Sequence, residues 1–482
     1  MIRTVSTWRQ KRRSGFLQVA PACAAALLLA ACSTTRPWVN QPITAESPSA
    51  STPIAAPTVE AAADARPTPA IIAAVTLSGG GARAAAFGLG VLQELKETQF
   101  TWDGRQTTLL DEVGLVSGVS GGSVLAGYYA AFGDETFTRF ERDFLLVNFQ
   151  SSLVGDLTSP GSLYRLTSPW WGRSNILAQR LDTVFRGTTF GELRRTRPKP
   201  RLLVTATDLT TGGPFEFTPE QFALICSDLD SVPLSFAAAA SAAVPILLSP
   251  VTLHNYAGNC PPSVPLYEQS PADGNLSARL LNLIAQSYQD SKERPYIHLV
   301  DGGMVDNLGV RSLVDRVIAG GSLERSFGAL PPGSVHKIVL ISVNSERDTA
   351  ERIDTSDRVP SVGQVVDSLV FGAGSRVTTE TTEMVNDVAR RMSEQLRADR
   401  TRPGSPFAPD AEIHVINVSL RGLRDPEVRR TLMSVPTAFT ILPIQVRQLQ
   451  IAGRQALRES PEFQRLRRSL TAAPEMAIAD MP

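Results

Sequence analysis

Short apolar runs alternate with amphipathic stretches along most of the chain. Residues 71–77, with the sequence IIAAVTL, have the length and apolar character of a buried strand, and residues 84–96 follow with apolar positions at helical spacing. The same order recurs over residues 112–117 and 124–132. Further strands are expected over residues 201–207, 296–300, 336–343 and 412–418, and further helices over residues 310–319 and 375–397. Strands that alternate with helices predict an α/β fold.

The N-terminus has a different pattern, in which basic residues precede a single apolar run. Residues 16–31 are too short for a comfortable membrane span and follow Arg12 and Arg13, as in a secretory signal. The run ends in Leu29-Ala30-Ala31-Cys32, which resembles the lipobox of bacterial lipoproteins, where the cysteine receives diacylglycerol. We therefore expect a signal peptide over residues 1–31 and lipidation of Cys32 in the bacterial cell envelope. The alternative is an ordinary signal peptide with Cys32 as a chance thiol, and both alternatives predict export.

Composition divides the rest of the chain into three parts. Residues 42–70 are rich in Pro, Ala, Ser and Thr and have almost no large apolar side chains, so they cannot form a core. We expect a tether over residues 32–70, a globular domain over residues 71–345, and a mainly helical C-terminal extension with one further strand over residues 346–482. By resemblance, Ser33 after the cysteine favours sorting to the outer membrane, with the protein facing the periplasm.

Charge and cysteine content narrow the classes of partner. Lys plus Arg and Asp plus Glu both total 47 in 482 residues, so no net charge favours a nucleic acid. The acidic residues are not grouped as a calcium loop, and we expect neither a metal ion nor a cofactor. Outside the signal region only Cys226 and Cys260 remain, and in an oxidising periplasm they are candidates for a disulfide. The sequence alone leaves that pairing open.

The sharpest chemical motif is Gly118-Val119-Ser120-Gly121-Gly122, a GxSxG pentapeptide between a predicted strand and a predicted helix. A nucleophilic serine at such a junction occupies a strained turn, where side chains at the flanking glycine positions would clash. The N-terminus of the following helix also directs positive charge at the site. The setting predicts that Ser120 is a nucleophile.

A second glycine turn, Gly79-Gly80-Gly81, lies between the first strand and its helix and is followed by Arg83. Unobstructed backbone N–H groups in such a turn can stabilise the oxyanion of acyl transfer. A nucleotide-phosphate loop is the alternative, but the chain has no GxxxxGK[ST] sequence, and Ala84 stands where a GxGxxG turn would need its third glycine. We therefore interpret Gly79, Gly80 and Gly81 as an oxyanion hole.

The serine needs a base, and two kinds of residue are candidates. In the chain order of an α/β-hydrolase, His336 or His414 would serve, but each begins a buried-strand pattern, which is more typical of a structural histidine. Asp301 directly follows a predicted strand and precedes Gly302 and Gly303, a position that suits a functional carboxylate. Read in isolation, Asp301 would be a turn-initiating residue.

Taken together, the segments SGGGAR, GVSGG and LVDGG resemble the patatin-like phospholipase family in content, order and spacing. The resemblance implies a three-layer α/β/α fold with a mostly parallel central sheet, a Ser120–Asp301 dyad, the Gly79–Gly81 oxyanion loop and a motif arginine at Arg83. Residues 240–245, with the sequence ASAAVP, also resemble a family segment. Ser78 and Ala84 depart from the common pattern, which leaves the loop geometry open. The motif glycines are Gly118, Gly121, Gly122, Gly302 and Gly303.

The resemblance and the expected anchor together favour a membrane-anchored serine hydrolase that cleaves acyl esters of phospholipids or lysophospholipids. Two alternatives stay open: an inactive lipoprotein that binds lipid or a partner, and an esterase that uses a histidine. The Trp170-Trp171 pair is either an interfacial anchor or ordinary loop packing, and the latter is the more frequent case. The head group, the choice between hydrolysis and acyl transfer, and the oligomeric state are not predicted.

Overall fold

The computed structural model describes residues 33–44, 70–261, 275–327, 330–347, 356–361, 364–365, 368 and 373–471. The predicted signal peptide, the lipidation site Cys32 and residues 45–69 of the predicted tether lie outside these residues.

The central sheet has eight strands. They are β2 (Ala70–Leu77), β5 (Val113–Gly118), β6 (Arg201–Asp208), β7 (Pro214–Glu216), β9 (Val251–His254), β10 (Tyr296–Val300), β11 (Val335–Asn344) and β12 (Phe407–Ser419). Their order is β12-β11-β2-β5-β6-β10-β9, with β7 also paired to β6. The pairs from β12 to β6 are parallel, whereas β10, β9 and β7 join antiparallel. Two short ladders pair β1 (Gln41–Pro42) with β8 (Ser227–Asp228) and β3 (Gln99–Trp102) with β4 (Arg105–Thr108).

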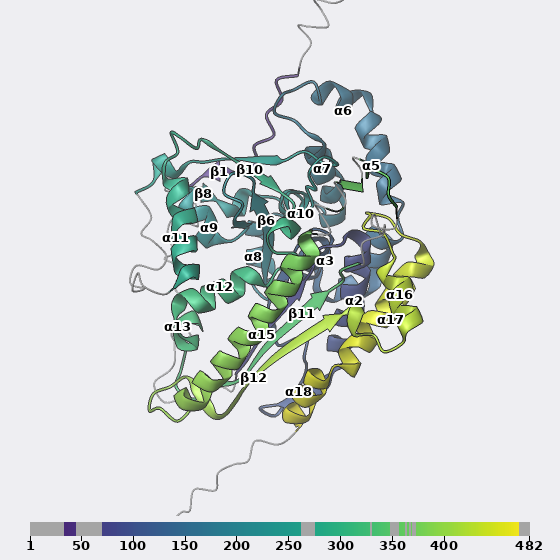
Figure 1. Cartoon of the computed structure of the whole chain (residues 1–482). Coiled ribbons are helices and arrows are strands. Elements are labelled where there is room, and N and C mark those ends of the chain that lie inside the picture. Colours follow the sequence, from purple (N-terminus) through teal and green to yellow (C-terminus); the bar gives the residue numbers. More distant parts are fainter. Residues whose placement is uncertain are drawn as a thin grey trace, which may run out of the picture.

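Helices cover both faces of the sheet, and Figure 1 shows α15 lying in front of β11 and β12. The α-helices are α2 (Gly81–Glu97), α3 (Gly121–Phe132), α4 (Thr136–Phe140), α5 (Phe149–Thr158), α6 (Pro160–Arg165), α7 (Arg173–Phe185), α8 (Phe190–Thr196), α9 (Pro219–Leu224), α10 (Leu234–Ser241), α11 (Leu276–Gln289), α12 (Arg311–Gly320), α13 (Leu323–Phe327), α15 (Ala373–Asp399), α16 (Pro426–Met433), α17 (Pro443–Glu459) and α18 (Pro461–Thr471). The predicted three-layer α/β/α fold with a mostly parallel sheet is confirmed.

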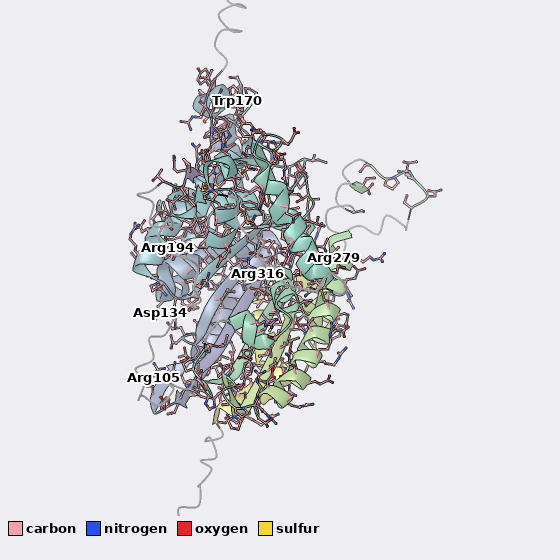
Figure 2. The ribbon with its side chains drawn as sticks, turned by 90° about the vertical axis from the view of Figure 1, so that its left-hand side faces the viewer. Arg105, Asp134, Trp170, Arg194, Arg279 and Arg316 are labelled. Carbon is pink, nitrogen blue, oxygen red and sulfur yellow. A yellow bond between two sulfur atoms is a disulfide. The ribbon has the colours of Figure 1, made fainter. Side chains whose placement is uncertain are left out.

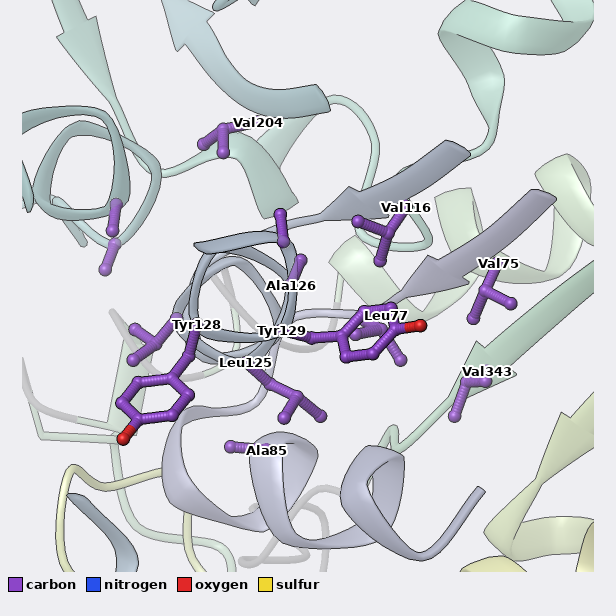
Figure 3. Close-up of a cluster of buried hydrophobic side chains, with 14 of the residues drawn as sticks. Val75, Leu77, Ala85, Val116, Leu125, Ala126, Tyr128, Tyr129, Val204 and Val343 are labelled. Carbon is purple, nitrogen blue, oxygen red and sulfur yellow. The ribbon is translucent and has the colours of Figure 1, made fainter. Parts of the chain in front are cut away.

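The alternation of side chains along β11 explains why helices are needed on both faces. Val339, Ile341 and Val343 belong to the main core cluster, whereas Ile338 and Leu340 pack against the clusters under α12 and α15. The middle of β11, Ile338–Ile341 (IVLI), is therefore an unbroken apolar run, as expected for a strand of a parallel sheet that is buried on both faces. Figure 3 shows the main core around α3, where Leu125 and Ala126 lie close to side chains of β2 and β5.

The C-terminal region is part of this core. β12 extends the sheet beside β11, and α17 lies against α2 in such close contact that a side chain at Gly90 would overlap the carbonyl oxygen of Gln450. Leu449 and Phe463 belong to the same core cluster as the buried side chains of β2. The described residues from 373 to 471 form helices and the strand β12, and they are built into the same core as the strands β2 and β5.

The beginning of the predicted tether is also packed against the domain. Ser33 N–H donates to Thr167 Oγ1 (2.9 Å), and the Asn40 side-chain amide donates to Ser227 Oγ (3.0 Å) and to the carbonyl oxygen of His254 (2.9 Å). The Trp38 ring stacks on Tyr296, with ring centroids 5.5 Å apart. Residues 33–44, at the start of the predicted tether, are therefore held against the domain by a few specific side chains.

Cys226 and Cys260 form a disulfide, with Cα atoms 5.8 Å apart. The carbonyl oxygen of Cys226 accepts a hydrogen bond from Ile43 N–H (3.0 Å), so the disulfide lies beside the packed N-terminal segment. The pairing that the sequence left open is present in the structure.

Within the described ranges, no helix combines the length and the apolar character required to cross a bilayer.

Candidate active site

The two glycine turns lie side by side because their strands are neighbours in the sheet. β2 and β5 are parallel, and Leu77 pairs with Gly118 in register, so both turns begin at the same edge. A side chain at Gly121 would overlap the carbonyl oxygen of Gly81, and one at Gly122 would overlap that of Leu77. The glycines of both motifs thus permit backbone-to-backbone contact between the turns.

Ser120 occupies the turn between β5 and α3 with φ 50° and ψ −122°, a conformation that non-glycine residues rarely adopt. Its N–H donates to Ser241 Oγ (2.8 Å), which in turn donates to the carbonyl oxygen of Thr205 (2.6 Å). The structure places Ser120 at the N-terminus of α3, as the sequence predicts, and the neighbouring strand and helix hold its unfavourable backbone conformation.

Asp301 follows β10, and its main chain is held on both sides. Its N–H donates to the carbonyl oxygen of Ala243 (3.0 Å), and its own carbonyl oxygen accepts a hydrogen bond from Thr207 Oγ1 (2.8 Å). The carboxylate accepts a hydrogen bond from Gly303 N–H (2.7 Å), and it lines the same cavity as Ser120, whose side chain acts to lower its pKa. The two predicted catalytic residues, 181 positions apart in the chain (301 minus 120), are therefore in contact.

Burial raises the pKa of Asp301 to about 6, although the hydrogen bonds from Gly303 and Ser120 act to lower it. A carboxylate with this pKa is ionised at neutral pH and is a much better proton acceptor than an exposed aspartate.

The glycine loop differs from the prediction at one position. Gly79 N–H already donates to the carbonyl oxygen of Asn307 (2.9 Å), so it is not available to a bound oxyanion in this conformation. Gly80 and Gly81 have φ values of 141° and 62°, and no acceptor for their N–H groups is present among the described residues. Of the three predicted donors, these two remain candidates.

Arg83 is buried, and two of its side-chain nitrogens bind main-chain carbonyl oxygens. Its Nε donates to the carbonyl oxygen of Ser345 (2.8 Å) and its Nη1 to that of Val435 (2.6 Å). Burial and the charge of Arg347 lower the pKa of Arg83 to about 9, while Glu346 raises it, so the guanidinium stays protonated at pH 7. The arginine joins the start of α2 to two distant segments of the chain.

Ser120 and Asp301 line one small cavity of about 60 Å³, which is enough for one or two water molecules. Part of its wall comes from the region after residue 345, so the predicted C-terminal extension covers the site. The lining residues are Gly79, Gly80, Arg83, Ser120, Val244, Asp301, Gly303, Met304, Asn307, Glu346, Arg347, Gly374, Ser375, Thr378 and Thr437.

Residues 75–314 match the model of the family described as patatin-like phospholipase. The chain belongs to the patatin-like phospholipase family. Membership of this family supports a lipid acyl hydrolase activity in general terms. No curated protein matches the sequence significantly.

Two solved structures resemble the patatin-like chain. Human GIVD cytosolic phospholipase A2 aligns with a TM-score of 0.42 and 12% identity over 83% of this chain and 62% of that one. The same enzyme in complex with methyl gamma-linolenyl fluorophosphonate aligns with a TM-score of 0.38 and 12% identity over 83% of this chain and 59% of that one. This chain therefore covers less than two thirds of the length of these structures.

The histidines of the patatin-like chain lie away from its serine. His336 is at the amino end of β11, seven residues before Val343, which is level with the edge that carries Ser120, so about 23 Å of strand separates them, and it pairs with Asp410 (2.8 Å). His414, on β12, is paired with Glu462 of α18 (2.8 Å). Within the described part of the chain no histidine lines the cavity, and no cluster of three or more His, Cys, Asp or Glu side chains could hold a metal ion.

Two further residues complete the site, and the motif analysis assigned neither of them a role. Ser241 fixes the nucleophile turn, and Asn307 binds the glycine loop through its carbonyl while its side chain lines the cavity. Ser241 lies in the ASAAVP segment, which was noticed only as a resemblance. Asn307 carries no sequence signal beyond following the LVDGG motif by four residues (307 minus 303).

Proposed function

We propose that this protein is a serine lipid acyl hydrolase that cleaves phospholipid or lysophospholipid esters through a Ser120–Asp301 dyad. The observation that carries the proposal is that Ser120 and the buried carboxylate of Asp301 line one small cavity, which no described histidine lines, and that the Ser120 side chain acts to lower the pKa of this carboxylate. A serine needs a neighbouring base to act as a nucleophile at neutral pH, and Asp301 is the base within reach.

In the first half-reaction, Ser120 Oγ attacks the ester carbonyl carbon while Asp301 accepts the hydroxyl proton. The N–H groups of Gly80 and Gly81 stabilise the oxyanion. Asp301 then gives the proton to the leaving alkoxide, which departs as an alcohol and leaves an acyl ester on Ser120. In the second half-reaction, Asp301 accepts a proton from water, hydroxide attacks the acyl ester, and the proton returns to Ser120 as the fatty acid leaves.

The present cavity holds the reacting groups but not an acyl chain. A volume of about 60 Å³ is well below the 300–1,000 Å³ that is usual for ligand pockets. Substrate binding therefore requires the cavity to widen, and Gly374, Ser375 and Thr378, which the C-terminal part of the chain contributes to its lining, are the residues that we expect to move.

The second part of the proposal is the location. Cys32 carries the lipid anchor, and the enzyme works in the bacterial cell envelope, at the periplasmic side of the outer membrane. Support comes from the Leu29-Ala30-Ala31-Cys32 motif and from the disulfide, which suits an oxidising compartment. Metabolic labelling with a fatty acid analogue should mark the wild type and not the Cys32→Ser variant.

The test of the chemistry is an acyl substrate panel on the full chain, with diacyl phospholipid, lysophospholipid and a soluble short-chain ester. Wild type should hydrolyse at least one lipid and be labelled at Ser120 by a fluorophosphonate. Ser120→Ala should lose both activity and labelling, and Asp301→Asn should lose activity. Correctly folded wild type without labelling would favour the alternative of an inactive lipid-binding lipoprotein. Equal activity in all three proteins would refute the dyad.

A further inference from the structure

Exposed aromatic and aliphatic side chains surround the point where the described chain begins. Ser33 N–H binds Thr167 Oγ1 (2.9 Å), and Ser168 Oγ donates to the carbonyl oxygen of Thr35 (2.8 Å). These bonds fix the segment that directly follows Cys32 against the turn between α6 and α7. Since consecutive Cα atoms are about 3.8 Å apart, any acyl chains on Cys32 would begin within one residue of this turn.

The surface beside that point is apolar although it is solvent-exposed. Leu163 and Tyr164 on α6 are both 53% exposed, Trp170 is 41% exposed, and α6 has no buried residue. In Figure 2, Trp170 lies at the upper end of the molecule, whereas Arg105 of the β3–β4 hairpin lies towards the lower end. The rings of Trp38, Trp170, Trp171 and Tyr296 line a hollow of about 460 Å³ in the same region.

The charges of this surface are all positive. Residues 33–44 and 160–173 contain no Asp or Glu. Arg36 lies over the Trp170 ring, 4.6 Å from its centroid, and Arg165 lies 5.4 Å from that of Trp171. Tryptophan and tyrosine rings beside arginines are the side chains that favour the headgroup level of a bilayer, where arginine binds phosphate.

The same surface continues to the candidate active site. Arg173 Nη2 donates to the carbonyl oxygen of Ile246 (2.8 Å), and Ile246 and Leu247 are 65% and 66% exposed. Val244, two positions before Ile246, lines the cavity of Ser120 and Asp301. Arg173 thus joins the segment after α6 to the exposed pair Ile246 and Leu247, which lies two positions from a residue of the cavity wall.

We propose that this surface, which we call the docking strip (residues 33–38, 160–173, Ile246 and Leu247), lies on a phospholipid bilayer with anionic headgroups. The bilayer is the one that holds the acyl chains of Cys32, so the inference rests on the anchor under the proposed function. A fixed N-terminal segment beside the strip determines which face of the protein meets the membrane. An ester at the bilayer surface then reaches the cavity along Ile246 and Leu247.

The first experiment measures the orientation independently of catalysis. The lipidated full-length protein is placed in phosphatidylethanolamine and phosphatidylglycerol vesicles that contain brominated acyl chains, which quench nearby tryptophan fluorescence. Trp170→Phe should remove roughly half of the quenching, because Trp170 lies at headgroup depth. The matched control is Trp102→Phe, in β3, which packs edge-on against His336 (5.9 Å) and should leave the quenching unchanged. Equal effects of both substitutions would overturn the docking strip.

The second experiment compares hydrolysis at a membrane with hydrolysis in solution. The double variant Leu163→Ser, Tyr164→Ser should hydrolyse vesicle phospholipid about tenfold more slowly than wild type, with an unchanged rate on a soluble short-chain ester. The matched control is Leu280→Ser, Leu283→Ser on α11, whose side chains are 44% and 60% exposed and should not matter. Unchanged vesicle hydrolysis in the first variant would contradict the proposal. A wild type that is inactive on every ester would refute the proposed function and leave the quenching result interpretable.

Discussion

The turn that follows β10 contains two buried aspartates, and they differ in what they face. Burial raises the pKa of both Asp301 and Asp306 to about 6. Asp301 lines the cavity together with Ser120, whose side chain acts to lower its pKa. Asp306 accepts hydrogen bonds from the N–H groups of Val310 (3.3 Å) and Arg311 (2.8 Å) at the start of α12. A raised pKa therefore identifies a carboxylate whose ionised form is destabilised by burial. Only its neighbours show whether it can act as a catalytic base.

The largest difference between the two aspartates should appear in catalysis. Asp301→Asn should lower kcat/KM by about 10³- to 10⁴-fold, because the amide cannot accept the serine proton. Asp306→Asn should keep the rate within a few-fold of wild type. The measurement is hydrolysis of a soluble ester by purified full-length proteins of matched thermal stability. A comparable loss in both variants would mean that folding of the turn, and not proton transfer, is being measured.

The second prediction concerns pH. Because the base must be ionised, kcat/KM should fall about tenfold per pH unit below the pKa of Asp301, which is about 6, and should be constant above it. Asp306→Asn should keep this acidic limb at the same pH. A limb that disappears with Asp306, or a profile that is flat down to pH 4, would contradict the assignment of the base.

The third prediction concerns stability. The pKa of Asp301 is raised from 3.8 to about 6, so the folded state binds more protons than the unfolded state between these values. Stability therefore falls as pH rises through this window, and the full penalty is present above pH 6. Asp301→Asn should remove a penalty of at most about 3 kcal/mol at pH 8 and should have no such effect at pH 3.5. Urea unfolding at both pH values tests this, and a variant that is less stable at pH 8 would refute it.

The smallest expected effect is that of replacing Asn307, which we expect to contribute less to catalysis than Asp301. Asn307 adjoins Asp306 in sequence, but its side chain lines the cavity with Asp301. Asn307→Ala keeps the main-chain bond to Gly79 and removes only the side-chain amide, so we expect roughly a tenfold lower kcat/KM with little change in stability. An unchanged rate would assign Asn307 to the packing of the loop alone.

The sequence predicted those parts of the molecule that depend on local pattern. The first strand was expected over residues 71–77 and is β2 (Ala70–Leu77), and the helix expected over residues 375–397 lies within α15 (Ala373–Asp399). The strand–turn–helix setting of Ser120 was also predicted, since glycine spacing and an apolar run determine it locally. The proposed roles of Ser120 and Asp301 remain predictions until activity is measured.

What the sequence could not supply depends on contacts between distant segments. Two hydrogen bonds of the site, from Gly79 N–H to the carbonyl oxygen of Asn307 and from Ser120 N–H to Ser241 Oγ, join residues more than a hundred positions apart. The packing of residues 33–44 rests on a few bonds, such as that from Asn40 to Ser227, which no periodicity encodes. The short antiparallel strands β7 and β9 are defined by their place at the margin of the sheet, so their own residues gave little signal.

The contact between the glycine loop and the C-terminal region has a consequence for how the chain is divided. Ala82 N–H, at the start of α2, donates to the carbonyl oxygen of Ala438 (2.8 Å), and Arg83 binds that of Val435. The segment that matches the family ends at residue 314, more than a hundred positions before either acceptor. The stretch that matches the family is thus shorter than the stretch that packs as one core, and a fragment cut at the family boundary would lack the partners that hold its own glycine loop.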